Sequence, residues 1–131
     1  MDGYGKRVLV VDDDADSRQV LALLLVQAGY SVHEASDGLE AMNEMKRRRF
    51  DVVVTDYHMP RLNGFELLML SRVVWPDLPV VIVSGSQGNM ADLAAQHGAF
   101  AWIRKPYETA FLLDVVNEAA RRSTHDRTHT A

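Results

Sequence analysis

The sequence predicts an α/β fold, a single domain with a doubly wound parallel sheet. Short apolar segments alternate five times with longer segments of helical periodicity, as in a sheet whose strands are joined by helices. Most of the apolar segments are rich in valine and isoleucine, which is typical of parallel strands buried on both faces. Because crossovers between parallel strands are right-handed, alternate helices are expected on opposite faces of the sheet.

The predicted strands lie at residues 7–12, 31–35, 51–55, 80–84 and 100–104. Most of these segments are apolar along their whole length, so each side chain is expected to contact a covering layer. The second segment is the exception, since Ser31-Val32-His33-Glu34-Ala35 alternates polar and apolar residues. That alternation favours an edge strand.

The predicted helices lie near residues 16–28, 38–48, 65–75, 88–97 and 107–122. Gly29 and Gly98 are placed as helix-ending glycines, while Asn63-Gly64 precedes the third helix and Pro76 follows it. Apolar residues at helical spacing are expected to face the core. In helix order they are Val20, Leu23, Leu24 and Ala28; Leu39, Met42 and Met45; Phe65, Leu68 and Val73; and Phe111, Leu112, Val115, Val116 and Ala119.

Length and composition fit one globular domain. The chain has 131 residues, 47% of them apolar, with no cysteine and a net charge of −4. The basic run Lys46-Arg47-Arg48-Arg49 suits a solvated helix end, so we expect no nucleic-acid binding by this domain. No segment predicts a membrane span or signal peptide, so a cytoplasmic location is expected. Residues 1–122 are the predicted domain, and residues 123–131 are expected to form a polar, disordered tail.

Polar residues follow four of the predicted strands at the point where each strand ends. Asp12 and Asp13 follow the first, Asp56 the third, Ser84 the fourth and Lys105 the fifth. Because ligands bind beyond the carboxyl ends of the strands in such a sheet, these side chains are expected to meet there. A few carboxylates suit Mg²⁺, and a carboxylate can act as a nucleophile toward phosphorus. The sequence therefore predicts a site for a divalent cation and a phosphoryl group.

Each of these residues also has a purely structural explanation. The aspartates at 12–14 could cap the first helix, and Asp14 is left out of the site for that reason. Asp56 could be a turn residue, Ser84 a loop hydroxyl and Lys105 a solvated cation. Their joint placement at matching strand ends favours the functional interpretation.

The chain resembles the receiver domain of two-component response regulators, including the single-domain chemotaxis regulator, from Val8 to about Ala120. The motifs are Val-Val-Asp12-Asp13, the run from Asp56-Tyr-His-Met-Pro60 to Gly64, Ser84-Gly85 and Lys105-Pro106. The resemblance implies a flavodoxin-like (βα)5 domain with strand order 2-1-3-4-5. It also implies that the chain is not an enzyme beyond its own phosphorylation and dephosphorylation.

The resemblance assigns a role to each matching residue. Asp56 resembles the phospho-acceptor, which takes phosphoryl from a sensor histidine kinase or a phosphotransfer protein. Mg²⁺ or Mn²⁺ is implied, with Asp12, Asp13, Asp56 and the backbone carbonyl of His58 as ligands. Ser84, Lys105 and Trp102 resemble the residues that bind phosphoryl or switch, and the Lys105-Pro106 bond is expected to be cis.

Two positions depart from the usual family pattern. Trp102 occupies the place of a tyrosine or phenylalanine switch residue, so the usual serine–aromatic coupling is open, and a partly exposed packing role is the alternative. His58 is expected to tune dephosphorylation or only to contact solvent.

Phosphorylation is expected to change the surface formed by the fourth helix, fifth strand and fifth helix, so that an unknown downstream protein binds one state better. Trp102, Tyr107 and Met90 are the candidate exposed residues there.

Two other functions compete with this one. A phosphorylation-independent docking scaffold would retain the fold without accepting phosphate. A haloacid-dehalogenase-type phosphatase would also use a strand-end aspartate, but it needs a further acidic pair after its lysine, and only scattered acidic residues follow Lys105.

Overall fold

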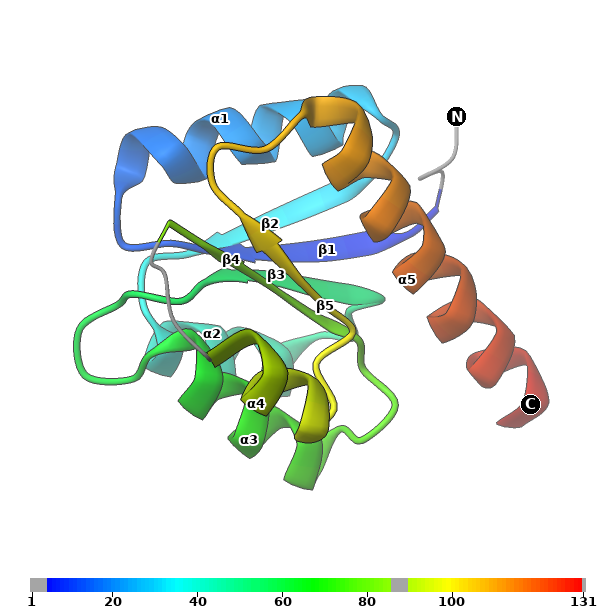
Figure 1. The fold of residues 1–131 in the computed structure, drawn as a ribbon. Coiled ribbons are helices and arrows are strands. Elements are labelled where there is room, and N and C mark those ends of the chain that lie inside the picture. The colour runs from blue at the N-terminus through cyan, green and yellow to red at the C-terminus, as the bar shows by residue number, and fades with distance from the viewer. Residues whose placement is uncertain (1–4, 86–89, 131) are drawn as a thin grey trace.

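The computed structural model describes residues 5–85 and 90–130, with side chains as far as Arg122. Its centre is a five-stranded parallel sheet in the order β2-β1-β3-β4-β5 (Figure 1). The strands are β1 (Arg7–Val11), β2 (Ser31–Ala35), β3 (Val52–Asp56), β4 (Val80–Ser84) and β5 (Ala101–Arg104). The predicted fold class is confirmed, and β2 lies at an edge, as its alternating pattern indicates.

In the part of the chain that the structure describes, five helices connect or follow the strands. They are α1 (Ala15–Gln27), α2 (Gly38–Arg47), α3 (Gly64–Val74), α4 (Met90–Gln96) and α5 (Thr109–Thr130). The first two residues predicted for α4, 88 and 89, lie outside the described residues. The helix α5 continues through residues 123–130, where the sequence predicts a polar, disordered tail, and residue 131 lies outside the described part. The end of the domain at residue 122 therefore stays a prediction. The segment contains neither glycine nor proline, and a helix that has already formed extends easily through polar residues.

The helices form two layers around the sheet. α1 and α5 cover one face, and α2, α3 and α4 cover the other (Figure 1). The expectation that helices alternate between faces was therefore wrong. With right-handed crossovers, the face depends on the direction in which the chain moves along the sheet. The chain steps one way from β1 to β2 and then the opposite way through β3, β4 and β5, which places three successive helices together.

The core-facing sides of the helices differ from the prediction by about one residue. In α1, Leu21 and Leu25 are buried, whereas Val20 and Leu23 are 62% and 59% exposed. Every residue from 20 to 26 is apolar, so periodicity alone leaves the buried side undetermined. The same kind of error leaves further residues exposed that were expected in the core, namely Leu39, Val73 and Phe111.

The register of the strands brings their carboxyl ends level with one another. Val11 of β1 is paired with Thr55 of β3, and Asp56 is paired with Val83 of β4. Ser84 is in turn paired with Arg104 at the end of β5. The residues that follow these strands therefore lie at one edge of the sheet, where β1 separates the two directions of chain travel.

Candidate functional site

Three carboxylates meet at this edge of the sheet. Asp12, Asp13 and Asp56 each offer an oxygen, and these oxygens lie within 4.8 Å of one another. Asp12 is buried, Asp56 is half-buried and Asp13 is exposed. Hard carboxylate oxygens, with one side open to water, are the ligand set that Mg²⁺ prefers. The residues present thus fit a divalent cation.

The loop between β1 and α1 has a capping role as well. The Asp14 side chain accepts a hydrogen bond from the Ser17 backbone N–H at 2.9 Å, which makes Asp14 the N-cap of α1. Hydrogen bonds from Ser17 hold the pKa of Asp14 below its ordinary value. The capping alternative is therefore right for Asp14, and the acidic cluster begins one residue earlier.

Asp12 is the most buried carboxylate of the cluster. Burial raises the pKa of Asp12 above its ordinary value, and the negative charge of Asp56 acts in the same direction. A hydrogen bond of 2.9 Å from the Asp14 backbone N–H to Asp12 Oδ1 opposes this rise without cancelling it. A cation at this point would remove the repulsion between the carboxylates.

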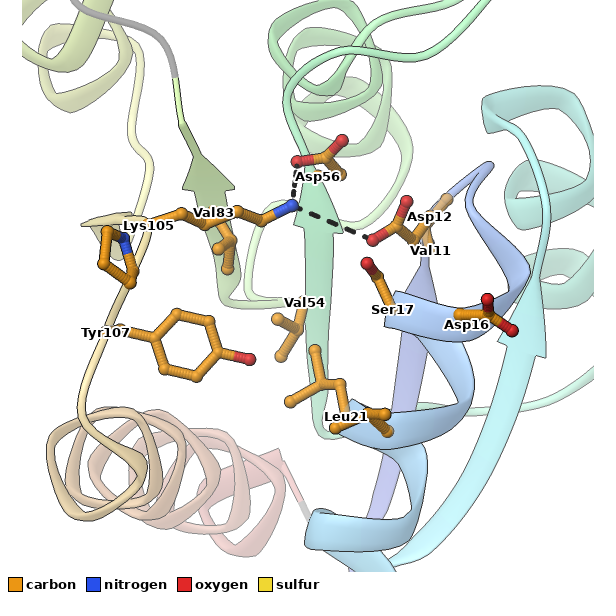
Figure 2. A pocket seen from close by; sticks show the side chains of 12 residues that line it. Val11, Asp12, Asp16, Ser17, Leu21, Val54, Asp56, Val83, Lys105 and Tyr107 are labelled. Carbon is orange, nitrogen blue, oxygen red and sulfur yellow. Dashed lines mark hydrogen bonds and ion pairs between the residues drawn. The ribbon is translucent and has the colours of Figure 1, made fainter.

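Lys105 supplies a positive charge beside these carboxylates. Its Nζ lies 3.1 Å from Asp56 Oδ1 and 4.0 Å from Asp12 Oδ2 (Figure 2). Burial alone would lower the pKa of Lys105, but the hydrogen bond to Asp56 and the charges of Asp56 and Asp12 raise it above its ordinary value. The Lys105-Pro106 peptide bond is cis, as predicted.

A pocket of about 420 Å³ opens beside Asp56, between α1 and the loop that leads to α5. Figure 2 shows the Tyr107 ring reaching into it, so Tyr107 was wrongly expected on the exposed surface next to β5. Burial raises the pKa of its hydroxyl. The pocket is lined by Val11, Asp12, Asp16, Ser17, Val20, Leu21, Val54, Asp56, Val83, Lys105, Pro106 and Tyr107.

The remaining predicted residues lie on the side of β4 and β5. Ser84 is fully buried as the last residue of β4, and its carbonyl accepts a hydrogen bond of 2.9 Å from the Lys105 N–H. Trp102 is half-buried and packs against Tyr57, with ring centroids 5.5 Å apart. Met90 is half-buried at the start of α4. Trp102 is thus partly exposed, and its role as a switch residue stays a prediction.

The loop from Asp56 to α3 packs tightly against the backbone of Asp56 and Tyr57. The Gly64 N–H donates to the Tyr57 carbonyl at 2.8 Å, and a Cβ at position 64 would lie 2.6 Å from the Asp56 carbonyl oxygen. Asn63 and Glu66 form a capping box at the start of α3. Asn63-Gly64 predicted this helix start, but the contact with Asp56 has no sequence signal. His58 is exposed, with its ring edge-on to Tyr57.

The fold and the site together define the class of protein. It is an α/β domain with an acidic cluster and a lysine at the carboxyl edge of a parallel sheet in the order β2-β1-β3-β4-β5. Residues 8–117 match the family model described as the response regulator receiver domain. The chain belongs to this family, the receiver domains of two-component systems.

Known relatives agree with this assignment. The chain is 44% identical over 104 residues to protein-glutamate methylesterase/protein-glutamine glutaminase 1 of Anaeromyxobacter dehalogenans, and 36% identical over 121 residues to the response regulator MprA of Mycobacterium sp. strain KMS. The matches cover 76% and 92% of the chain, but only 29% and 53% of these relatives. A receiver domain protein from Clostridium thermocellum has a similar structure, with a TM-score of 0.86 at 32% identity, covering 91% of this chain and 97% of that one.

No helix within residues 5–85 and 90–130 combines the length and apolarity that a membrane crossing requires.

Proposed function

We propose that this receiver domain takes a phosphoryl group onto Asp56 from the phosphohistidine of a sensor histidine kinase or a phosphotransfer protein. The observation that carries this proposal is the gathering of Asp12, Asp13 and Asp56 within 4.8 Å, with the Lys105 ammonium 3.1 Å from Asp56. Membership of the receiver family supports it. In the reaction, an Asp56 carboxylate oxygen forms a bond to phosphorus while the bond from phosphorus to the imidazole nitrogen breaks.

The acidic cluster would hold Mg²⁺ or Mn²⁺ through Asp12, Asp13, Asp56 and the backbone carbonyl of His58. A bound ion would neutralise the charge on the phosphoryl oxygens during transfer. Lys105 contributes a fixed positive charge on the opposite side, and its raised pKa keeps it protonated at neutral pH. The open pocket beside Asp56 leaves the nucleophile accessible to a donor that approaches between α1 and the loop before α5.

Phosphorylation would then be transmitted through Ser84 and Lys105 to the surface formed by α4, β5 and α5. A phosphoryl group adds charge and hydrogen-bond acceptors, which favour movement of the loops that carry these residues. Trp102 lies on β5, so its contact with Tyr57 links that surface to the residue next to Asp56. A downstream protein or output domain would bind one of the two states more tightly.

The proposed unit comprises residues 1–122 and works in the cytoplasm without contacting nucleic acid or a membrane. The matched residues, 8–117, fall inside these bounds. Family membership argues against the haloacid-dehalogenase-type phosphatase, so no turnover of an external phosphoester is proposed. A docking scaffold that does not depend on phosphorylation is the remaining alternative, and a single experiment separates the two.

That experiment is intact-mass spectrometry after incubation with acetyl phosphate and Mg²⁺. We expect one added phosphoryl group on the wild type and on Asp77→Asn, which removes an exposed carboxylate outside the site. Asp56→Asn, and the wild type in EDTA, should gain none. Absence of the adduct on wild type, together with no binding of beryllofluoride, would leave the scaffold function and overturn this proposal.

A further inference from the structure

Arg18 connects two segments of the chain that the phosphoryl site needs in fixed positions. It is the fourth residue of α1, and its side chain is only 16% exposed. Its Nη1 donates a hydrogen bond of 2.8 Å to the Asp12 carbonyl oxygen, and its Nε lies 3.0 Å from Glu34 Oε1 on the edge strand β2. No feature of the sequence pattern singled out this residue.

The Asp12 carbonyl lies in the loop between β1 and α1, at the peptide bond that joins Asp12 to Asp13. The backbone N–H of Asp12 is held by the Ala35 carbonyl at 3.1 Å, and its carboxylate is held by the Asp14 N–H at 2.9 Å. Its carbonyl begins the peptide unit that carries Asp13, so the orientation of that carbonyl sets the direction in which the Asp13 side chain leaves the chain. The N–H and the carboxylate of Asp12 are thus held by other residues, and Arg18 holds its carbonyl.

The planar guanidinium of Arg18 suits this double contact. It presents several N–H donors in a rigid fork, so it can reach a carbonyl and a carboxylate together, whereas a lysine ammonium has no such fork. Glu34 lies opposite Val10 in the register of β1 and β2, which aligns the guanidinium with the end of β1. Because Arg18 is largely buried, its hydrogen bond to Asp12 is protected from competition by water.

We propose that Arg18, oriented by Glu34, is a positioning residue for divalent-cation binding, because it holds the Asp12–Asp13 peptide in the geometry that directs both carboxylates toward Asp56. This inference rests on the proposed function of Asp12, Asp13 and Asp56 as a metal site. Residues that orient metal ligands commonly change metal affinity about 10–100-fold when they are removed. Arg18 acts on the ligands through their backbone and contacts no metal itself.

The test is Mg²⁺ affinity measured by isothermal titration calorimetry, beside circular dichroism and thermal melting of each variant without metal. We expect Arg18→Ala to raise the Kd about tenfold or more. Arg18→Lys should recover part of that loss. Glu34→Gln should weaken binding by a smaller factor, because the hydrogen bond to Asp12 remains. The matched control is Arg47→Ala, which removes an exposed arginine paired with Glu44 on α2, and it should leave the Kd unchanged.

The outcomes separate this inference from the proposed function. If the wild type binds no Mg²⁺, both fail. If the wild type binds Mg²⁺ and folded Arg18→Ala binds it equally well, with only a lower melting temperature, Arg18 has a purely structural role and this inference alone is overturned. Should Arg18→Ala fail to fold, Arg18→Lys decides, since an unchanged Kd in that variant contradicts the need for the arginine fork.

Discussion

At the scale of single residues, the site combines the buried carboxylate of Asp12 with the ammonium of Lys105. The charge of Lys105 offsets only part of the cost of burying that carboxylate. Asp12 is 7% exposed and has a raised pKa, because burial and the charge of Asp56 disfavour its ionised form. Lys105 lies 4.0 Å from Asp12 but closer to Asp56. The folded domain therefore holds one carboxylate in a place that suits a metal ligand better than it suits the stability of the metal-free protein.

The Asp12→Asn variant should be more stable than the wild type at pH 7 in metal-free buffer, because the amide carries no charge that burial and Asp56 disfavour. The pKa of Asp12 is raised in the fold above its ordinary value of 3.8. Its contribution to stability is therefore complete below that value and is lost as pH rises through the folded pKa. Urea unfolding of the wild type and the variant at pH 7 and pH 3 measures the stability difference above and below the titration of Asp12. A variant that is less stable than the wild type at pH 7 would contradict this account.

The meeting of the site residues could be predicted because the carboxyl ends of parallel strands share one edge of a sheet. Asp12, Asp56 and Lys105 come together at this edge, because each lies at or just beyond the end of a strand. The contact between Arg18 and the Asp12 carbonyl could not be predicted, because it depends on the direction of one side chain from a helix. The inward placement of Tyr107 was missed for the same reason, since its position in the loop after Lys105 leaves both directions open.

At the scale of elements, α1 shows where hydrophobic periodicity fails. The stretch from Val20 to Val26 is apolar on every side of the helix, so its composition cannot distinguish the buried residues from the exposed ones. The sheet decides the orientation, and Leu25 becomes fully buried while Leu23 is 59% exposed. The strands were predicted to within one residue because their apolar runs are short and are bounded by polar residues.

This assignment predicts very different effects for two leucines of one helix. Leu25→Ala should lower the free energy of unfolding by about 2–5 kcal/mol, because it leaves a cavity between α1 and the sheet. Leu23→Ala, the matched control, should change it by less than about 0.5 kcal/mol. Urea denaturation followed by circular dichroism compares the two. Equal effects, or a larger effect at Leu23, would show that α1 is rotated relative to the sheet described here.

At the scale of the whole molecule, the strand order decides both the layers and the location of the site. The chain reverses its direction of travel along the sheet after β2, which leaves α1 with α5 on one face and the other three helices opposite. That reversal could not be predicted from the composition of any segment, because it is a property of the order in which strands pair. It also creates the crevice at the carboxyl edge where the three aspartates meet.

A divalent cation bound in this crevice should stabilise the whole domain. Under the proposed function Mg²⁺ binds the assembled cluster and not the unfolded chain. The Tm should then rise with Mg²⁺ concentration, by the equivalent of about 2.7 kcal/mol at one hundred times the Kd. Differential scanning calorimetry with increasing Mg²⁺ measures this. Asp13→Asn should abolish most of the rise, and Asp77→Asn should preserve it. A Tm that does not respond to Mg²⁺ in the wild type would argue against a metal site.

Lys105 already has an anionic partner in the described structure, 3.1 Å from its ammonium. Under the proposed function, modification of Asp56 would exchange that partner for phosphoryl oxygens, so Lys105 would trade one ionic contact for another. The driving force for the conformational change is then the difference between the energies of these two contacts and not the full energy of either. A difference of about 1.4 kcal/mol leaves one molecule in eleven in the less favoured state. Such a domain would keep a standing basal signal before any phosphate arrives, and its output would be graded.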